Sequence, residues 1–320
     1  MHSQIYHKIK NPKTNTYLST FSISEDDKIL ASAYYRENYV LIYDFKKSLL
    51  LRKIKILKPH IVFIYKNWLL ITSEFKKSTE VVIYNLNNFK ITSKYKTNHV
   101  FPHSMYVNKD LIFITFCEGE NKTGSVISLK FNSLIGIINE KLQIIHKPFF
   151  SLGDTKGICA DEKNNFLFVS FESEPINFYN LLINRFKFFF LKNKFVEINN
   201  KSGIAIFKIY KDGKISEKPL KIIKFDKGSR LEDIQIYKKK LVIVDLVNNF
   251  IFIYELNNNL ELKFIKKISN NLNSPHSVRF YNKGKKLLVG NTNIKVTNKI
   301  VHFWRYNKNT RNAFISYNFL

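Results

Sequence analysis

The 320-residue chain is 45% hydrophobic and 15% aromatic, which excludes a disordered protein and supplies enough apolar side chains for a sizeable core. Its two cysteines, Cys117 and Cys159, have no CxxC spacing, which excludes a disulfide framework and a thiolate zinc motif, so we expect a protein of a reducing compartment, the cytoplasm. The net charge of +27 reflects 52 basic and 25 acidic residues, and only 7 of the basic residues are arginine, a bias typical of an AT-rich genome. We therefore expect a lysine-coated surface and no sequence-specific nucleic-acid binding. A selected anionic partner is the alternative.

A unit of three short strand-like runs recurs along the chain. The first unit begins at 18–24 with LSTFSIS and continues with ILASAYY and YVLIYDF. The second reads PHIVFIY, WLLITSEF and VVIYNL, and the third reads PHSMYV, LIFITFCE and SVISLKF. These runs are rich in β-branched and aromatic residues, and turns with Asn, Lys, Asp or Gly separate them. The pattern predicts antiparallel strands in up-and-down order.

Three further units follow in the second half of the chain. The fourth begins at 156–160 with KGICA, continues with FLFVSFE, and reaches its third run, SGIAIFKIY, only after a long insertion. The fifth reads LEDIQIY, LVIVDL and FIFIYEL, and the sixth reads PHSVRF, KLLVGN and KIVHFWRY. The sequence therefore contains six copies of one supersecondary unit.

The length of the unit identifies the architecture. A looser fourth run follows most units, as in LLLRKIKI at 49–56 and LELKFIKKI at 260–268. His60 and His103 head the second and third units 43 residues apart, which is the spacing of a four-stranded propeller blade. We predict an all-β, six-bladed β-propeller with four-stranded antiparallel blades around a central channel, in which residues 1–320 form a single domain. A seventh blade is the alternative if the insertion contains one.

The ends of the chain flank the six units. A propeller leaves open strand edges unless its first and last segments meet, and open edges invite aggregation. We therefore expect residues 1–16 or residues 312–320 to supply the outer strand of the last blade from the opposite end of the chain.

Three stretches resemble known repeat families. LVIVDLVNNFIFIYEL at 241–256 resembles the NHL repeat, in which an Asp closes the second strand and an Asn precedes the third. SPHSVRFYNKGKKLLVGN is similar to the blade openings of lactonase-like and YncE-like propellers, and LSTFSISEDDKILASAYY is similar to a WD- or lactonase-type opening. The Gly-His and Trp-Asp dipeptides of WD repeats are missing, although HFWRY at 302–306 holds the place of the tryptophan. The resemblance implies the propeller fold far more than a function.

Two sets of polar residues are expected at one face of the channel. In a propeller, strand one of each blade lines the channel, and it begins at the face where strand two ends. Strand one is headed by His60, His103, Lys156, Asp233 and His276. Strand two is closed by Arg36, Glu37, Glu74, Glu118, Glu172, Asp245 and Asn291.

The three Pro-His pairs allow two interpretations. Proline fixes φ and needs no hydrogen bond from its nitrogen, so the pair suits a strand entry in which the histidine only caps its blade. Alternatively, His60, His103 and His276 point into the channel mouth and bind an anionic ligand or one divalent metal ion. We expect His60 and His103 to be the closer pair, because their blades are neighbours. The candidate ligand-binding residues are His60, His103, His276, Glu74, Glu118, Arg36, Lys156 and Asn291.

The acidic residues also allow a plain structural interpretation. Glu74, Glu118 and Glu172 have lysines nearby with which they can pair, and Asp245 matches an NHL position that bonds within the blade. The acidic loop at 116–124, FCEGENKTG, lacks the ligand spacing of an EF-hand.

The insertion at about 173–202 is aromatic and strongly basic, and a loop of this length is usually functional or disordered. It can close the channel as a lid or present a surface to a partner. Its densest apolar patch, RFKFFFLKNKF at 185–195, is too short and too rich in lysine to cross a bilayer, and the N-terminus lacks the apolar core of a signal peptide. We expect a monomer without a transmembrane segment.

Two functions from different classes remain. The chain has no P-loop, GxGxxG, GxSxG, HExxH or CxxC motif, which disfavours nucleotide-dependent enzymes and the usual serine hydrolases. We therefore expect a binding scaffold for a protein, a glycan or a small anionic ligand at the loop face of the channel. The alternative is a channel-centred lactonase-like hydrolase or lyase that uses a metal ion.

Overall fold

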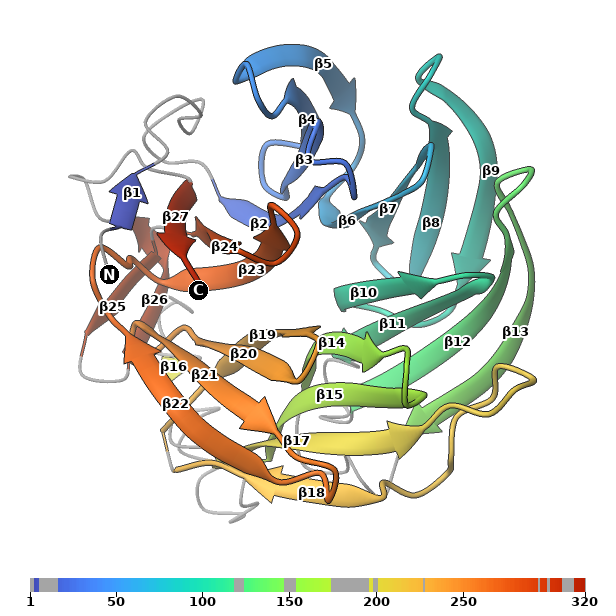
Figure 1. Ribbon diagram of the computed structural model, residues 1–320. Helices are drawn as coiled ribbons and strands as arrows, with labels where there is room; N and C mark the ends of the chain where they lie inside the picture. The colour runs from blue at the N-terminus through green and yellow to red at the C-terminus, as the bar shows by residue number, and fades with distance from the viewer. Residues whose placement is uncertain are drawn as a thin grey trace.

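The computed structural model describes residues 3–5, 17–117, 124–146, 154–173, 196–197, 201–226, 228–292, 294–297, 300–306 and 314–319. It confirms the six-bladed β-propeller: six four-stranded antiparallel sheets stand around a central channel (Figure 1). No helix occurs in these residues, and hence none that could span a membrane.

Blades one to three use consecutive strands, as the turn spacing predicts. In each, four strands pair in chain order, from the channel outwards. The strands are β2 (Leu18–Ile23), β3 (Ile29–Tyr34), β4 (Tyr39–Asp44) and β5 (Leu49–Lys55); β6 (Pro59–Tyr65), β7 (Trp68–Phe75), β8 (Ser78–Asn85) and β9 (Lys90–Thr97); and β10 (Pro102–Asn108), β11 (Leu111–Cys117), β12 (Gly124–Asn132) and β13 (Ile137–His146).

Blades four to six include the insertions. Blade four skips one strand, and blade six takes strands from both ends of the chain. The strands are β14 (Thr155–Asp161), β15 (Phe166–Ser173), β17 (Lys201–Lys208) and β18 (Lys221–Lys224); β19 (Leu231–Tyr237), β20 (Lys240–Asp245), β21 (Phe250–Leu256) and β22 (Leu262–Ile268); and β23 (Pro275–Tyr281), β24 (Lys286–Asn291), β27 (Phe314–Asn318) and β1 (Ser3–Ile5).

The two ends of the chain close the ring together. The outer strand of blade six is β1, as expected for the N-terminal segment, and it pairs with β27 from the C-terminal segment. The prediction that KIVHFWRY is the third strand of this blade is wrong: β24 pairs with β27 instead. Residues 300–306 form β26 (Ile300–Tyr306), which pairs with β25 (Ile294–Thr297) and β16 (Val196–Glu197) in a separate three-stranded sheet. HFWRY therefore does not hold the position of the WD tryptophan.

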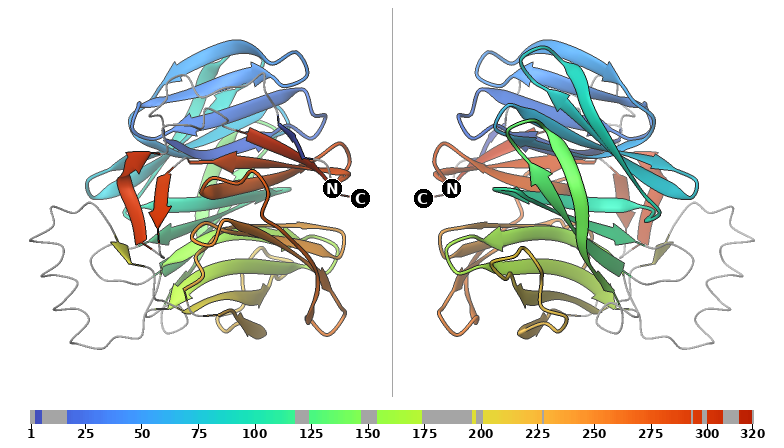
Figure 2. Two further views of the ribbon diagram at one scale, coloured as in Figure 1. Left: turned by 90° about the vertical axis from the view of Figure 1, so that its left-hand side faces the viewer. Right: turned by 90° about the vertical axis from the view of Figure 1, so that its right-hand side faces the viewer.

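The separate sheet arises from two connections that leave the same face of the ring. Strand β16 lies between β15 and β17, and the hairpin of β25 and β26 lies between β24 and β27. Figure 2 shows these three strands at one side of the propeller. Most of the predicted insertion at 173–202 lies outside the described residues; its ends, Ser173 and Lys201, pair with each other.

The core consists of six apolar clusters, one between each pair of adjacent blades. Between blades two and three, for example, Leu70 and Ile83 pack with Phe116 and Ile127, and all four side chains are fully buried. The corresponding cluster between blades six and one contains Phe21 and Phe314. Because strand side chains alternate between the two faces of a blade, apolar residues on both faces hold each blade between its neighbours.

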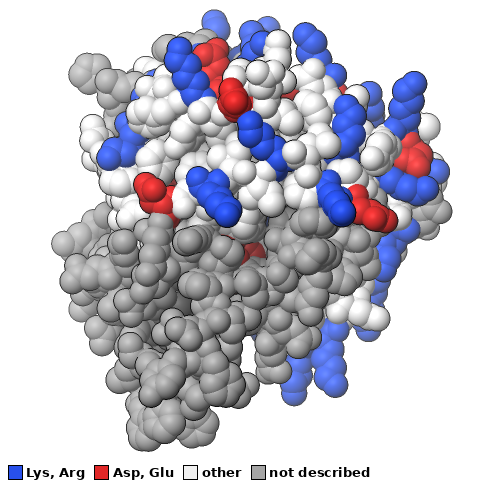
Figure 3. Space-filling view, turned by 90° about the horizontal axis from the view of Figure 1, so that it is seen from below, with Lys and Arg blue, Asp and Glu red and all other residues white. Residues whose placement is uncertain are grey.

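Many of the described lysines lie on exposed positions of the outer strands and of the turns between strands. Strand β9 carries Lys90, Lys94 and Lys96, and the described part of one side of the ring shows basic side chains interspersed with acidic ones, without a single stripe (Figure 3). Lysine on an edge strand also discourages pairing with another chain.

Candidate functional site in the channel

The six innermost strands share one irregularity. In every blade the first residue of strand one pairs with the end of strand two, and the register then shifts. Such a bulge re-aims a side chain. The second residue of each strand one thereby reaches the mouth of the channel, at the face where strand one begins, which we call the mouth face. These six residues, the channel ring, are Ser19, His60, His103, Lys156, Glu232 and His276.

The Pro-His pairs are entries into three of these strands. The residue before each proline has a left-handed backbone, with φ of 40° at Lys58, 54° at Phe101 and 50° at Ser274. Its carbonyl accepts a hydrogen bond from a backbone N–H at the end of strand two, at 2.9–3.3 Å. Proline then fixes the next φ. The entry is therefore the same in blades two, three and six, and it delivers each imidazole to the channel.

The three imidazoles come together. The ring centroids of His60 and His103 are 5.7 Å apart, and those of His103 and His276 are 5.6 Å apart. The prediction that His60 and His103 form the closer pair is therefore not confirmed: the two separations are nearly equal, because the channel is narrow enough for side chains of blades three and six to meet across it. His60 also lies beside the ring residue of blade one, with its Nδ1 3.3 Å from Ser19 Oγ.

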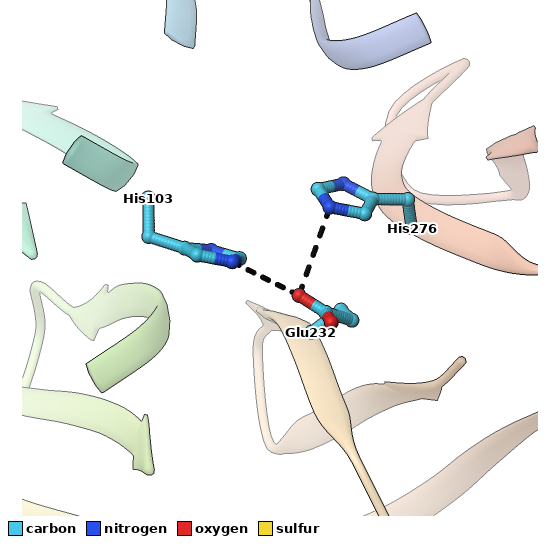
Figure 4. A group of neighbouring side chains, drawn as sticks. All are labelled: His103, Glu232 and His276. Carbon is cyan, nitrogen blue, oxygen red and sulfur yellow. Dashed lines mark ion pairs between the residues drawn. The ribbon is translucent and has the colours of Figure 1, made fainter. Parts of the chain in front are cut away.

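A carboxylate that the sequence analysis missed joins the imidazoles. Glu232 Oε2 lies 3.0 Å from His103 Nε2 and 3.6 Å from His276 Nε2 (Figure 4). All three side chains are buried. Two imidazoles and one carboxylate from blades three, five and six therefore converge on one point of the channel.

Asp233, predicted to head strand one of blade five, lies elsewhere. Its Oδ2 accepts hydrogen bonds from the backbone N–H of Val278 at 3.0 Å and from Arg279 Nη1 at 2.6 Å, and its Oδ1 accepts from Ile234 N–H. Asp233 thus joins blades five and six. Glu232, one residue earlier, takes the channel position because of the bulge.

Two cations, the buried Lys156 and the partly buried Arg230, are matched by carboxylates. Arg230 Nε forms short contacts with Glu232 Oε1 and lies 3.5 Å from Glu172 Oε1. Lys156 Nζ lies 3.4 Å from Asp154 Oδ2. Without this pairing, burial of either charge would be strongly unfavourable.

Burial and neighbouring charges set the protonation states of the histidines and of Glu232 in the channel ring. It lowers the pKa of His103 to about 4, an effect that the charge of Lys156 increases and Glu232 opposes. Burial also lowers the pKa values of the other two ring histidines. By itself it would raise the pKa of the Glu232 carboxyl, but the charges of Arg230 and Lys156 outweigh it and hold that pKa well below its usual value. At neutral pH, uncharged imidazoles therefore face an ionised carboxylate.

Two tyrosines of blade one lie beside the channel ring. The Tyr35 ring centroid is 5.4 Å from that of His60, and its hydroxyl donates to Glu74 Oε1 at 3.1 Å. The Tyr17 ring is 6.2 Å from that of His276, and the guanidinium carbon of Arg36 is 5.1 Å from the centre of Tyr17. Arg36 and Glu74 thus lie next to the channel ring and are not members of it.

The remaining predicted residues have structural partners or lie outside the described residues. Asn291 Oδ1 accepts from the backbone N–H of Asn273 at 3.2 Å, which joins the end of β24 to the segment before β23. Asp245 accepts from the backbone N–H groups of Arg230, Val247 and Asn248, as the NHL resemblance implies. Glu118 lies outside the described residues.

Sequence reasoning missed Glu232 and Arg230. A signal was present: Leu231 occupies the place of Pro59 and Pro102, so the residue after it corresponds to their histidines. Blade five lacks the proline that marks this position, and the alignment consequently slipped by one residue.

Comparison with known proteins supports the β-propeller fold and does not assign a function. No protein-family model matches the chain, and no curated protein matches its sequence. The chain is similar to the solved WD40 repeats of RRP9, with 11% identity, a TM-score of 0.60 and 99% of each chain covered. It is similar to Kuenenia stuttgartiensis hydrazine synthase (12% identity, TM-score 0.59, 85% of this chain and 80% of that one) and to a putative 6-phosphogluconolactonase from Bacteroides fragilis (12%, 0.55, 88% and 76%). Identities this low show the β-propeller fold alone.

Proposed function

We propose that this protein is a β-propeller binding scaffold that holds a protein partner on the mouth face. The observation that carries the proposal is an apolar rim in blades two and three, where Leu57, Phe75 and Phe101 are 48%, 39% and 46% exposed. Half-buried Tyr35 and Arg36 belong to the same face in blade one. Aromatic residues and arginine among exposed apolar groups are typical of protein interfaces.

The charged residues in and around the channel ring make a small anion an unfavourable ligand of the metal-free protein. Arg230 is already paired with Glu232 and Glu172, and Lys156 with Asp154. An anion would have to displace a carboxylate from one of these cations. Displacing Glu172 or Glu232 from Arg230 would leave a buried carboxylate unpaired, at a cost of about 3–5 kcal/mol. A partner bound to the rim meets no such cost.

Site-specific photo-crosslinking tests the scaffold. A benzophenone side chain at Phe101 would sit in the rim, whereas one at Phe264, which is 54% exposed on the outer strand β22, serves as the matched control. We expect one discrete crosslinked protein from position 101 in cell extract and none from position 264, and Leu57→Glu in the same chain should abolish the product. Equal labelling from both positions, or a product insensitive to Leu57→Glu, refutes a rim-specific partner.

A second candidate, a lactonase-like hydrolase or lyase, is favoured by the contact between His103 Nε2 and Glu232 Oε2 at 3.0 Å. An uncharged imidazole oriented by a carboxylate is the arrangement of a general base. Titration of the acid released from a sugar lactone tests it. Hydrolysis by the native protein that His103→Gln abolishes supports this candidate, and a rate equal to the uncatalysed one eliminates it for lactones.

A further inference from the structure

We propose that His103, Glu232 and His276 form a binding site for one divalent first-row transition-metal ion in the channel. Their ligand atoms all lie within 4.8 Å of one another. Donor atoms around a tetrahedral ion with bonds of about 2.0–2.1 Å stand about 3.3 Å apart. The two separations to Glu232 Oε2, 3.0 Å and 3.6 Å, bracket that value, and the two imidazole nitrogens lie within 4.8 Å of each other, so an ion would draw the two rings together around the carboxylate.

The carboxylate is held with one oxygen free. Glu232 Oε1 contacts Arg230 Nε, whereas the buried Oε2 faces the two imidazoles and has no other polar partner among the described residues. A ligating carboxylate is commonly oriented through its second oxygen by a neighbouring donor. Arg230 thus has the position of a residue that fixes the ligand without touching the ion.

A bond from each imidazole Nε2 to an ion would replace its contact with Glu232 Oε2 and place the ring proton on Nδ1. The Nδ1 atoms of His103 and His276 are buried and make no hydrogen bond within the described ranges, so no partner ties either ring to the wrong tautomer.

The donor set indicates the class of ion. Two imidazoles and one carboxylate suit zinc or ferrous iron, and they are too few and too rich in nitrogen for calcium or magnesium. Three carboxylates, the partly exposed Asp154 and the buried Glu172 and Glu232, lie beside two cations, so the site carries no excess positive charge that would repel a dication. His60 is outside the set, because the ligand atoms that lie within 4.8 Å of one another belong to His103, Glu232 and His276 alone among the described residues.

Zinc binding to the purified full chain tests the proposal. After treatment with a chelator and dialysis, we expect one Zn²⁺ per chain by calorimetry, and Co²⁺ should give the visible absorption of a low-symmetry nitrogen–oxygen site. Glu232→Gln and His276→Leu should each weaken Zn²⁺ binding by about 100-fold or more, beyond the effect of losing a supporting residue. His99→Gln, which removes a histidine outside the channel, and His60→Gln should change it by less than about threefold.

The outcomes separate this inference from the scaffold. Absence of stoichiometric Zn²⁺ binding, or Glu232→Gln binding as tightly as the native chain, overturns the metal site while leaving crosslinking at Phe101 untouched. A loss with His60→Gln equal to that with His276→Leu overturns the assigned donor set and points to three histidines instead. Circular dichroism confirms that each variant is folded, and His276→Leu decides the question if Glu232→Gln does not fold.

Discussion

The imidazole rings of His103 and His276 lie nearly parallel, at 21°, with centroids 5.6 Å apart, although their strands stand on opposite sides of the propeller. Side chains from opposite blades touch only in a narrow channel. The contact is the reason that six residues, each contributed by a different blade, can act as one site.

Replacement of His276 by leucine should not destabilise the metal-free protein. The buried Nδ1 of His276 lacks a hydrogen-bond partner in the described part of the chain, which costs about 1–3 kcal/mol, whereas a stacked ring pair contributes about 0.5–1.5 kcal/mol. We expect the melting temperature of His276→Leu to be unchanged or to rise by roughly 2–4 °C per kcal/mol gained, measured by calorimetry. A clear fall in melting temperature would mean that the imidazoles are kept to hold the blades together.

The stability effect of Glu74 should depend on pH. Burial is the largest influence on its carboxyl and raises the pKa above the usual 4.5, although the Tyr35 hydroxyl opposes the shift. Because the folded state then binds the proton more tightly than the unfolded state, the contribution of Glu74 is most favourable below pH 4.5 and is lost as the pH rises through the raised pKa.

Glu74→Gln removes the charge and keeps an oxygen for Tyr35. We expect the variant to melt higher than the native protein at pH 7 and the difference to shrink as the pH falls below 4.5. A difference in melting temperature that is constant across this pH range would contradict a raised pKa of the buried Glu74 carboxyl.

Gly157 should not tolerate a side chain. A Cβ atom there would lie 2.6 Å from the backbone nitrogen of Ile234 and 2.7 Å from the Cα of Asp233, both in the neighbouring blade five. Gly157→Ala would force blades four and five apart, at an expected cost of about 1–3 kcal/mol in urea unfolding. Ser277→Ala, at the same position in blade six, is the matched control and should be close to neutral, because its buried hydroxyl has no partner among the described residues.

The fold was predictable because it is repeated six times. The sequence of each blade contains the same order of strand-like runs and turns, so a weak strand pattern in one copy is supported by the others. The error at 300–306 arose because KIVHFWRY does form a strand, β26, but in a separate sheet, while the shorter β27 completes the blade. Strand propensity identifies a strand and not its partner.

The site was only partly predictable, for a local reason. The histidines were found because proline marks their position, but Glu232 was not, since alternation along a regular strand places a residue and its neighbour on opposite faces, and a bulge breaks that rule. The pairing of Arg230 with Glu232 and Glu172 depends on the distance between blades, which no single strand encodes.

Nucleic acid should bind weakly and without sequence preference. The lysines of the outer strands, such as Lys263 and Lys267 on β22, are exposed and spread around the ring rather than gathered in one groove. In fluorescence anisotropy we expect any DNA affinity to fall steeply between low and physiological salt, as it does for phosphate contacts alone. Binding that is selective for one sequence and resistant to salt would contradict this distribution of charge.

The closure of the ring by β1 should be essential for stability. Ser3, Gln4 and Ile5 pair with Tyr317, Ser316 and Ile315 of β27, and without them the edge of β27 would be open. Deletion of residues 1–5 should lower the melting temperature and cause concentration-dependent aggregation, because each lost ladder hydrogen bond contributes about 1 kcal/mol and an open edge can pair with another chain. Gln4→Pro should reproduce part of this effect, since proline cannot donate to the ladder, whereas Gln4→Ala should not. Calorimetry and light scattering measure the two effects, and a truncated protein that melts and remains monomeric like the full chain would show that β1 does not close the propeller.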